Sequence, residues 1–221
     1  RSLVGSEMCI RDRNILAEAG KITKVRGGAI SLDESFSAVE KNVEEKSAIC
    51  TEEKTAIAAY AASLVENGDF IFLDAGTTTE KMIEFLPQKD ITFVTNGFIH
   101  AKKLAQRGFR VFITGGEIKA ATEAIIGAEC VLTLKNYNFT KCFMGTNGIS
   151  LTAGFTTPDV NEARVKSAAM ESSRRSYILA DHSKFDEISS ATFAQLGKAN
   201  IITDRLSNSK YAEYTSIKEV M

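Results

Sequence analysis

Residues 74–79, with the sequence DAGTTT, contain groups suited to binding an anion. They follow the apolar run Phe70–Leu73 and precede apolar residues at helical spacing, which predicts a strand, a tight loop and a helix start. A helix start directs free backbone N–H groups outward at the positive end of the helix dipole. Gly76 lets a ligand approach the backbone, and three threonine hydroxyls stand beside it, which suits a phosphate. The alternative is an Asp-Gly turn with a threonine cap, because the pattern is not a Walker or dinucleotide fingerprint.

Four further polar motifs follow apolar runs that we predict to be strands. They are residues 95–97 (TNG), 114–116 (TGG), 145–148 (GTNG) and 181–184 (DHSK). In an open parallel sheet, ligands bind beyond the carboxyl ends of the strands, so we expect these motifs to converge with residues 74–79. The convergence predicts a polar pocket for a hydroxylated, anionic small molecule. The chain has no Trp and these motifs have no aromatic residue, which disfavours a nucleotide site built on base stacking.

A sixth motif, residues 154–159 (GFTTPD), leads into a predicted helix that Asp159 is placed to cap. Within that helix, Glu162 and Lys166 are four residues apart. Two interpretations stay open: a surface ion pair worth a few tenths of a kcal/mol, roughly, or two side chains that both reach the pocket. Lys184 is either a point charge for a phosphate or a solvated lysine. Asp74 either holds a sugar hydroxyl or fixes its own loop.

The elements that must position these groups alternate between strands and helices. Each predicted strand is short and nearly all apolar, as expected where both faces of a sheet are covered. Such alternation predicts an α/β fold with a mostly parallel sheet and helices on both faces. We predict strands at residues 70–73, 91–94, 109–113, 141–145, 177–180 and 201–203, and helices at 51–68 (capped by Thr51), after Gly76, and at 98–107, 124–134, 160–173 and 211–220.

Composition bounds the class of protein. The 221 residues are 44% hydrophobic and 25% charged, typical of a globular chain, and the length suffices for one large domain or for one domain with a small appendage. The net charge is −1, but residues 1–30 carry six basic and three acidic side chains, which leaves −4 for the remainder. A basic end on an acidic body suggests a nucleic-acid element joined to another function.

Cysteine and histidine usage disfavours metal and disulfide chemistry. The four Cys are far apart without a CxxC, and there are two His, so we expect reduced thiols, no metal site and no cofactor. No apolar stretch approaches the roughly 20 residues of a membrane span, and the N-terminus lacks the layout of a signal peptide. We therefore predict a cytoplasmic protein without a membrane partner.

The N-terminal region divides into three expected parts. Residues 1–13 lack periodicity and are interpreted as non-native sequence. Residues 14–19 predict a helix end, and residues 21–25 a short basic strand that turns at Gly27 and Gly28. This layout fits the wing of a winged helix-turn-helix, or else an ordinary surface hairpin. We assign residues 1–30 to a remnant of such a domain, 31–50 to a linker with a helical part, and 51–221 to a second domain.

As an ordered set, these motifs resemble the DeoR family of bacterial transcriptional repressors over about residues 14–204. The matching segments are residues 24–29 (KVRGGA), 74–78 (DAGTT), 95–96 (TN), 115–116 (GG), 143–145 (FMG) with Gly148, 156–159 (TTPD) with Glu162, Ala163 and Lys166, and 180–185 (ADHSKF). The resemblance implies a sugar-phosphate sensor domain with the fold of ribose-5-phosphate isomerase and the CoA transferases. In that family an N-terminal winged helix-turn-helix binds operator DNA, and a phosphorylated sugar changes the DNA affinity. The sequence departs from the family before residue 14, where we expect the DNA-reading domain to be truncated or overwritten.

We therefore predict a repressor of sugar catabolism that is not an enzyme. The alternative is a sugar-phosphate isomerase, with Asp74, Asp159 or Glu162 as base and Lys184 stabilising an enediolate. The basic segment 21–26 favours the repressor. Winged-helix repressors read paired half-sites, so a homo-oligomer is expected. The predicted ligand-binding residues are Asp74, Gly76, Thr77, Thr78, Thr95, Asn96, Gly145, Gly148, Asp159, Glu162, Lys166, Asp181 and Lys184, and the predicted DNA-binding residues are Arg13, Lys21, Lys24 and Arg26.

Overall fold

The computed structural model describes residues 22–25, 28–31, 35–37, 42–206 and 208–221. The chain forms two compact units, Arg1–Phe36 and Ser37–Met221. In the first unit, β1 (Ile22–Val25) and β2 (Gly28–Ser31) form an antiparallel hairpin, and β3 (Ser35–Phe36) follows. Strand β1 agrees with the strand predicted at residues 21–25, and β2 begins at Gly28, the second of the two glycines predicted to turn the chain. The interpretations of residues 1–13 and 14–19 lie outside the described residues.

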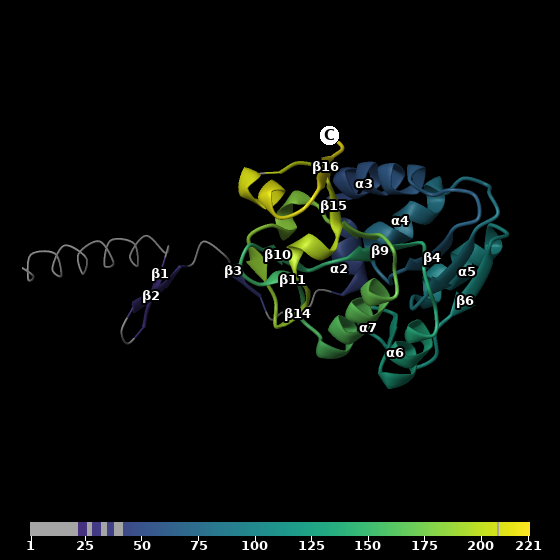
Figure 1. The fold of residues 1–221 in the computed structure, drawn as a ribbon, viewed down its shortest axis with the longest axis horizontal. Helices are drawn as coiled ribbons and strands as arrows, with labels where there is room; N and C mark the ends of the chain where they lie inside the picture. The colour runs from purple at the N-terminus through teal and green to yellow at the C-terminus, as the bar shows by residue number, and fades with distance from the viewer. Residues whose placement is uncertain (1–21, 26–27, 32–34, 38–41, 207) are drawn as a thin grey trace, which may run out of the picture. The chain divides into compact units, whose positions relative to one another are not determined.

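The second unit is built on a seven-stranded sheet with the order β16-β15-β12-β9-β4-β5-β6 (Figure 1). Every neighbouring pair in this sheet is parallel. The chain builds β4, β5 and β6 toward one edge and then continues from β9 toward the other. The order of strands therefore reverses between β4 and β9, the kind of position where open α/β sheets bind ligands. The strands are β4 (Phe70–Leu73), β5 (Thr92–Thr95), β6 (Arg110–Ile113), β9 (Lys141–Gly145), β12 (Ser176–Leu179), β15 (Asn200–Thr203) and β16 (Ile217–Glu219).

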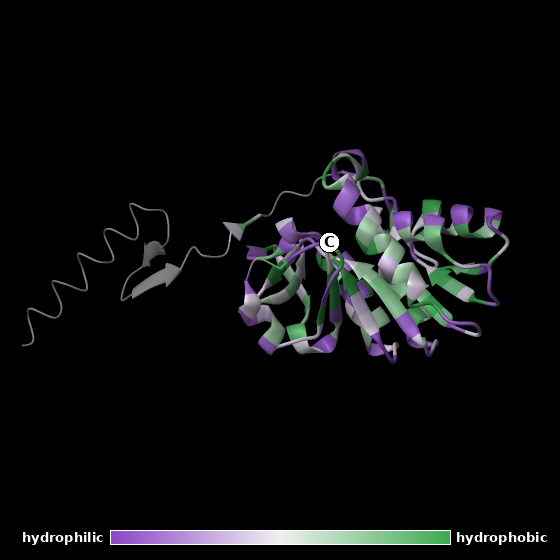
Figure 2. Cartoon of the chain, turned by 90° about the horizontal axis from the view of Figure 1, so that it is seen from above, coloured by the Kyte–Doolittle hydropathy of each residue, from purple (hydrophilic) through white to green (hydrophobic). Residues whose placement is uncertain are grey.

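Two hydrophobic clusters, one on each face of the sheet, form the core. Because successive side chains of a strand point to opposite faces, Ile71 and Leu73 enter one cluster and Phe72 enters the other. Helices α3 (Thr51–Ser63), α4 (Thr77–Phe85) and α5 (Phe98–Gln106) cover the first face, and α6 (Ala128–Lys135) and α7 (Val160–Glu171) cover the second (Figure 1). Hydropathy follows this arrangement, with the apolar residues concentrated along the strands (Figure 2). The predicted α/β fold with helices on both faces is confirmed.

Several short strands form small sheets separate from the seven-stranded sheet, and the sequence did not predict them. One sheet has the order β10-β11-β14, and β7 pairs with β8 in a hairpin. The helix predicted at residues 124–134 is wrong in its first part, because Ile125 N–H donates to the Asn96 carbonyl at 2.6 Å within β8, and α6 begins only after Gly127 at φ 99°. The added elements are β7 (Glu117–Lys119), β8 (Ala124–Ile126), β10 (Gly148–Ser150), β11 (Gly154–Thr157), β13 (Glu187–Ile188) and β14 (Ala191–Ala194).

The helix predicted at residues 211–220 is also wrong. The segment forms a 3-10 helix, η3 (Ser209–Glu213), and then β16, in which Ile217 lies opposite Ile201 of β15. Tyr211 is fully buried, and its hydroxyl lies 3.0 Å from the Ile149 carbonyl. Burial of this side chain and pairing at the sheet edge outweigh helical propensity. Two more 3-10 turns are η1 (His182–Lys184) and η2 (Leu196–Lys198).

The segment predicted as a linker contains a helix, α2 (Val43–Ala48), which Asn42 and Glu45 close with a capping box. Thr51 does not cap α3 as predicted. It is the first residue of α3, which follows Cys50 at a φ of 52° and ends at Ser63 rather than near Gly68. Among the described residues, none of the helices is both long and apolar enough to cross a membrane.

Candidate functional site

Two adjoining pockets lie at the carboxyl ends of the parallel strands, around the point where the strand order reverses. The lysine pocket, lined by Lys46, Lys54 and Lys184, has a volume of about 270 Å³. The carboxylate pocket, lined by Asp74, Glu80, Glu123 and Glu162, has a volume of about 70 Å³. The two pockets share Lys46, Gly76, Thr77, Gly145 and Asn147 in their walls.

The loop after β4 is supported by side chains of the turn after β5 and of α5. Ala75 N–H donates to the Asn96 side chain at 2.9 Å, and His100 Nε2 lies 3.3 Å from Gly76 N. The buried Thr79 hydroxyl donates to the Asp74 carbonyl at 2.6 Å. Gly76 is the N-cap of α4 and supplies no side-chain cap, so the threonine cap considered above is not formed. The first-turn N–H groups of α4 have no partner within the helix. This turn begins at Thr77, which lines both pockets together with Gly76.

A buried ion pair between β4 and α7 forms the floor of the carboxylate pocket. Lys166 Nζ donates to Asp74 Oδ2 and, at 3.1 Å, to the Gly145 carbonyl. Gly145 N–H donates to the same carboxylate oxygen at 3.1 Å. Asp74 and Lys166 are 2% and 6% exposed, so this pair joins the carboxyl ends of β4 and β9 to the middle of α7 in a low-dielectric setting.

Glu162 is the second buried carboxylate of this pocket. It accepts hydrogen bonds from the Thr122 hydroxyl at 2.7 Å and from Lys119 Nζ at 3.2 Å. Burial opposes ionisation of Glu162, but Lys166, Thr122 and Lys119 outweigh it and hold the pKa of this carboxyl below its ordinary value. The interpretation of Glu162 and Lys166 as a surface ion pair is therefore wrong, because both side chains are buried and line the pocket.

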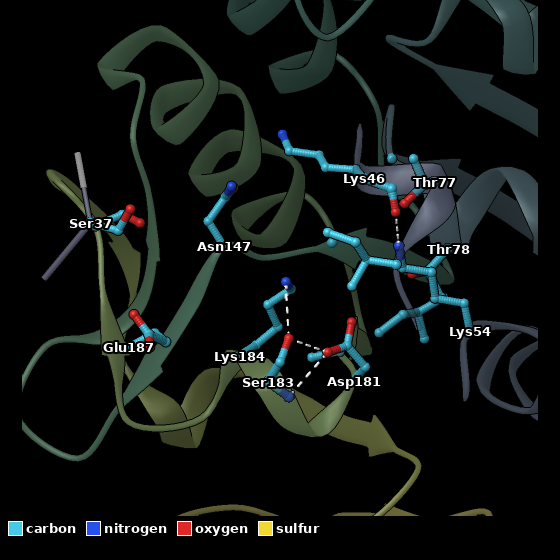
Figure 3. A pocket seen from close by; sticks show the side chains of 16 residues that line it. Ser37, Lys46, Lys54, Thr77, Thr78, Asn147, Asp181, Ser183, Lys184 and Glu187 are labelled. Atoms are coloured by element: carbon cyan, nitrogen blue, oxygen red, sulfur yellow. Dashed lines mark hydrogen bonds between the residues drawn. The ribbon is translucent and has the colours of Figure 1, made fainter. Parts of the chain in front are cut away.

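The lysine pocket combines cations with the N-terminal end of α4. Lys54 extends from α3 beside Thr77 and Thr78, and Lys184 extends into the pocket from the opposite side (Figure 3). Asp181 caps η1 through Ser183 N–H at 3.0 Å. Its burial favours the neutral acid, yet Lys184 and Ser183 keep the pKa of Asp181 below its usual range. With Glu187, the pocket lining carries three lysines against two carboxylates, a balance that favours an anion.

The structure brings most of the predicted ligand-binding residues together. Thr95, Asn96, Gly148 and Asp159 are outside the lining of both pockets. Asn96 supports the loop, and Asp159 caps α7 as predicted through Asn161 N–H at 2.7 Å. A side chain at Gly148 would lie 2.3 Å from the Glu187 carbonyl, so Gly148 serves close packing. Lining residues are Gly76, Thr77, Thr78, Gly145, Asp181 and Lys184 in the lysine pocket, and Asp74, Gly76, Thr77, Gly145, Glu162 and Lys166 in the carboxylate pocket.

Of the predicted DNA-binding residues, Arg13, Lys21 and Arg26 lie outside the described residues, and Lys24 lies in β1. Sequence reasoning missed Lys46, Lys54 and His100 in the pocket walls. Asn147, which lines both pockets, belongs to the predicted motif at residues 145–148 but was not among the predicted ligand-binding residues. Lys54 carried a usable signal, because it lies one helical turn before the buried residues Ile57 and Ala58.

The described residues include one group with donors suited to a metal ion, formed by Glu53, His182 and Asp204. The ligand atoms of this group lie within 4.8 Å of one another. Asp204 Oδ1 accepts a hydrogen bond from the backbone N–H of His182 at 2.7 Å. Asp204 Oδ2 lies 2.6 Å from Nδ1 of the same histidine. The contacts between Asp204 and His182 hold the turn after β12.

A family model described as the DeoR C-terminal sensor domain matches residues 49–205. The chain therefore belongs to the DeoR family. It is 44% identical over 214 residues to the HTH-type transcriptional regulator FruR of Bacillus subtilis, covering 95% of this chain and 84% of that protein. It is 34% identical over 222 residues to the lactose phosphotransferase system repressor of Staphylococcus epidermidis, covering 98% of this chain and 87% of that protein.

Among solved structures, the chain is similar to ribose-5-phosphate isomerase A from Methanocaldococcus jannaschii, with a TM-score of 0.44 and 16% identity over 61% of this chain and 54% of that one. It is also similar to eIF2B delta from Chaetomium thermophilum, with a TM-score of 0.48 and 19% identity over 65% of this chain and 51% of that one.

Proposed function

We propose that this protein is a transcriptional repressor of sugar catabolism whose sensor domain binds a phosphorylated sugar. The observation that carries the proposal is the pairing of two pockets, one rich in lysine and one rich in carboxylate, at the reversal point of the parallel sheet. The names of the relatives agree with this class, since one is an HTH-type transcriptional regulator and another a lactose phosphotransferase system repressor.

The two pockets suit the two ends of such a ligand. The phosphate lies at the first turn of α4, near Thr77, Thr78 and Lys184, where backbone N–H groups and an ammonium favour negative charge. The sugar hydroxyls lie toward Asp74 and Glu162, because carboxylate oxygens accept hydroxyl hydrogen bonds. The pocket residues predicted from sequence thus divide between phosphate and sugar.

Binding to operator DNA is assigned to the N-terminal unit, with Arg13, Lys21, Lys24 and Arg26 as its predicted contacts. The division at residues 30 and 50, the cytoplasmic location and the homo-oligomer remain part of the proposal. We assign no catalytic role to the pocket. Each carboxylate considered as an isomerase base is held by a lysine: Asp74 by Lys166, and both Asp159 and Glu162 by Lys119.

A thermal-shift screen of phosphorylated sugars against their unphosphorylated counterparts tests this function. A ligand at a hundredfold excess over Kd adds about 2.7 kcal/mol to the folded state, and for a chain of this size each kcal/mol raises Tm by roughly 2–4 °C. The right sugar phosphate should therefore raise Tm by about 5–11 °C, and the free sugar much less.

Thr77→Val and Lys184→Met should each remove most of that shift while leaving the Tm of the free protein nearly unchanged. Lys102→Met, at an exposed lysine of α5, is the matched control and should retain the shift. A shift that survives both pocket changes would place the phosphate elsewhere.

A further inference from the structure

Helix α2 lines both pockets without burying any of its residues. Val43 lines the carboxylate pocket, and Lys46 lines both. At its N-terminal end, Asn42 accepts from Glu45 N–H at 2.8 Å, and Val43 N–H donates to the Ala121 carbonyl at 3.2 Å. Because apolar burial supplies most of the stability of a packed helix, α2 depends on such polar contacts to keep its place.

The C-terminal end of α2 is held by the first turn of α3. Lys54 Nζ donates to the Lys46 carbonyl (Figure 3). The Thr51 hydroxyl donates to the Ser47 carbonyl at 3.3 Å. A cation beside the last carbonyls of a helix stabilises it through the helix dipole. Lys54 is therefore the one charged residue that both lines the lysine pocket and caps α2, among the contacts of the described residues.

Lys54 is held in a setting that favours an incoming anion. It is 4% exposed, and a buried ammonium is stable only with partners that satisfy its charge and its hydrogen bonds. Burial lowers the pKa of Lys54, Asp181 and Cys50 act in the opposite direction, and Lys184 and Lys81 lower the pKa further. A neutral carbonyl is a weaker partner for an ammonium than a phosphate oxygen is.

We propose that Lys54 binds the anionic group of the ligand, and that its transfer from the Lys46 carbonyl to this group loosens α2. The inference rests on the proposed function of the lysine pocket. When the anion draws the ammonium toward the first turn of α4, α2 loses the cation at its C-terminal end. In the chain, α2 lies between the N-terminal unit and α3.

Amide hydrogen exchange of the full chain, with inorganic phosphate as the probe and chloride at equal ionic strength as the reference, tests this step. In the wild type, phosphate should slow exchange at residues 76–80 and accelerate exchange across residues 43–48 by roughly tenfold, the effect of losing one hydrogen bond to a charged group. Lys102→Met should respond in the same way.

Two variants separate Lys54 from the rest of the site. Lys54→Met should show fast exchange at residues 43–48 without phosphate and no further acceleration with it. Lys54→Gln keeps an N–H donor but lacks the charge, so it should also lose the phosphate response. Unchanged protection of β4 and β9 in the same spectra verifies that each variant is folded.

The outcomes distinguish this inference from the proposed function. If phosphate protects residues 76–80 but leaves exchange at 43–48 unchanged in the wild type, the coupling through Lys54 is wrong and the anion site stands. If phosphate still accelerates amide exchange at residues 43–48 in the Lys54→Gln variant, the charge of Lys54 is not the trigger and the inference is overturned. If phosphate protects no amide at residues 76–80, the proposed phosphate site itself fails.

Discussion

The lysine pocket and the carboxylate pocket share five residues and yet are built in opposite ways. The charged groups of the carboxylate pocket are tied into the fold, since Asp74 pairs with Lys166 and Glu162 with Lys119 and Thr122. In the lysine pocket, Lys184 is half-buried and its ammonium lies 3.3 Å from a single exposed hydroxyl, that of Ser183. The charged groups of the carboxylate pocket are thus part of the fold, whereas the half-buried Lys184 is the lysine that, under the proposed function, is best placed to meet a ligand.

The largest effect is expected from breaking the buried Asp74–Lys166 ion pair. Lys166→Met leaves the Asp74 carboxylate buried without its ion-pair partner, and such a change costs about 3–5 kcal/mol of unfolding free energy. Lys103→Met removes a partly exposed pair with Glu80 and should cost about 0.2–1 kcal/mol. Urea unfolding measures both. Equal effects of the two substitutions would show that the buried Asp74–Lys166 pair is no more integral to the fold than the partly exposed Lys103–Glu80 pair of the same pocket.

The sequence predicted the sheet and the position of the site because both depend on local patterns. Apolar runs of four or five residues followed by Gly-, Thr- and Asn-rich motifs mark buried parallel strands and their carboxyl ends, and β4 and β9 lie as expected. The antiparallel strands at residues 148–157 are three and four residues long, too short for a period of two to show.

Charged side chains were harder to place, because their partners are distant in the chain. The partner of Lys166 is Asp74, 92 positions earlier, and not its helical neighbour Glu162. The role of Asn96 as a support for the loop depends on a hydrogen bond to Ala75, which no local pattern specifies. Lys54 was missed because lysine on a helix is usually solvated, although this one lies on the buried face.

A second prediction sharpens the division between sugar and phosphate. Glu162→Gln keeps the shape of the side chain but removes a charged acceptor, so the affinity for the sugar phosphate should fall about tenfold. The affinity for inorganic phosphate should not change, whereas Lys184→Met should weaken both ligands. Isothermal titration calorimetry with the two ligands measures this. If Glu162→Gln lost affinity for inorganic phosphate, the two pockets would have to be described as one anion site.

A third prediction concerns His100, which lines the carboxylate pocket behind the loop at Gly76. Burial lowers the pKa of His100, although Glu80 and Asp74 act against it and Lys103 adds to it. The unfolded chain therefore binds a proton at a higher pH than the folded chain does. Unfolding free energy should fall as the pH drops below about 6.5, by at most about 1.4 kcal/mol per pH unit.

His100→Gln should flatten the dependence of unfolding free energy on pH between 5 and 7, as measured by urea unfolding at several pH values. His182, the other histidine of the chain, is unchanged in this variant. An unchanged slope would show that His100 does not report on the burial of the pocket.

The smallest expected effect tests where the carboxylate pocket ends. Asp159 was predicted to bind the ligand, but it lies outside both pocket linings, caps α7 and pairs with Lys119 at 3.1 Å. Asp159→Ala should lower the unfolding free energy by about 1 kcal/mol, the usual cost of losing an N-cap, and Asp159→Asn, which can still cap, by less. Because burial is outweighed by the Glu162 N–H and by Lys119, the pKa of Asp159 is lowered, and its contribution to the unfolding free energy is lost on acidification below about pH 4.

Neither variant of Asp159 should change the thermal shift given by the sugar phosphate. A shift reduced in both variants would return Asp159 to the binding site and extend the carboxylate pocket to the start of α7.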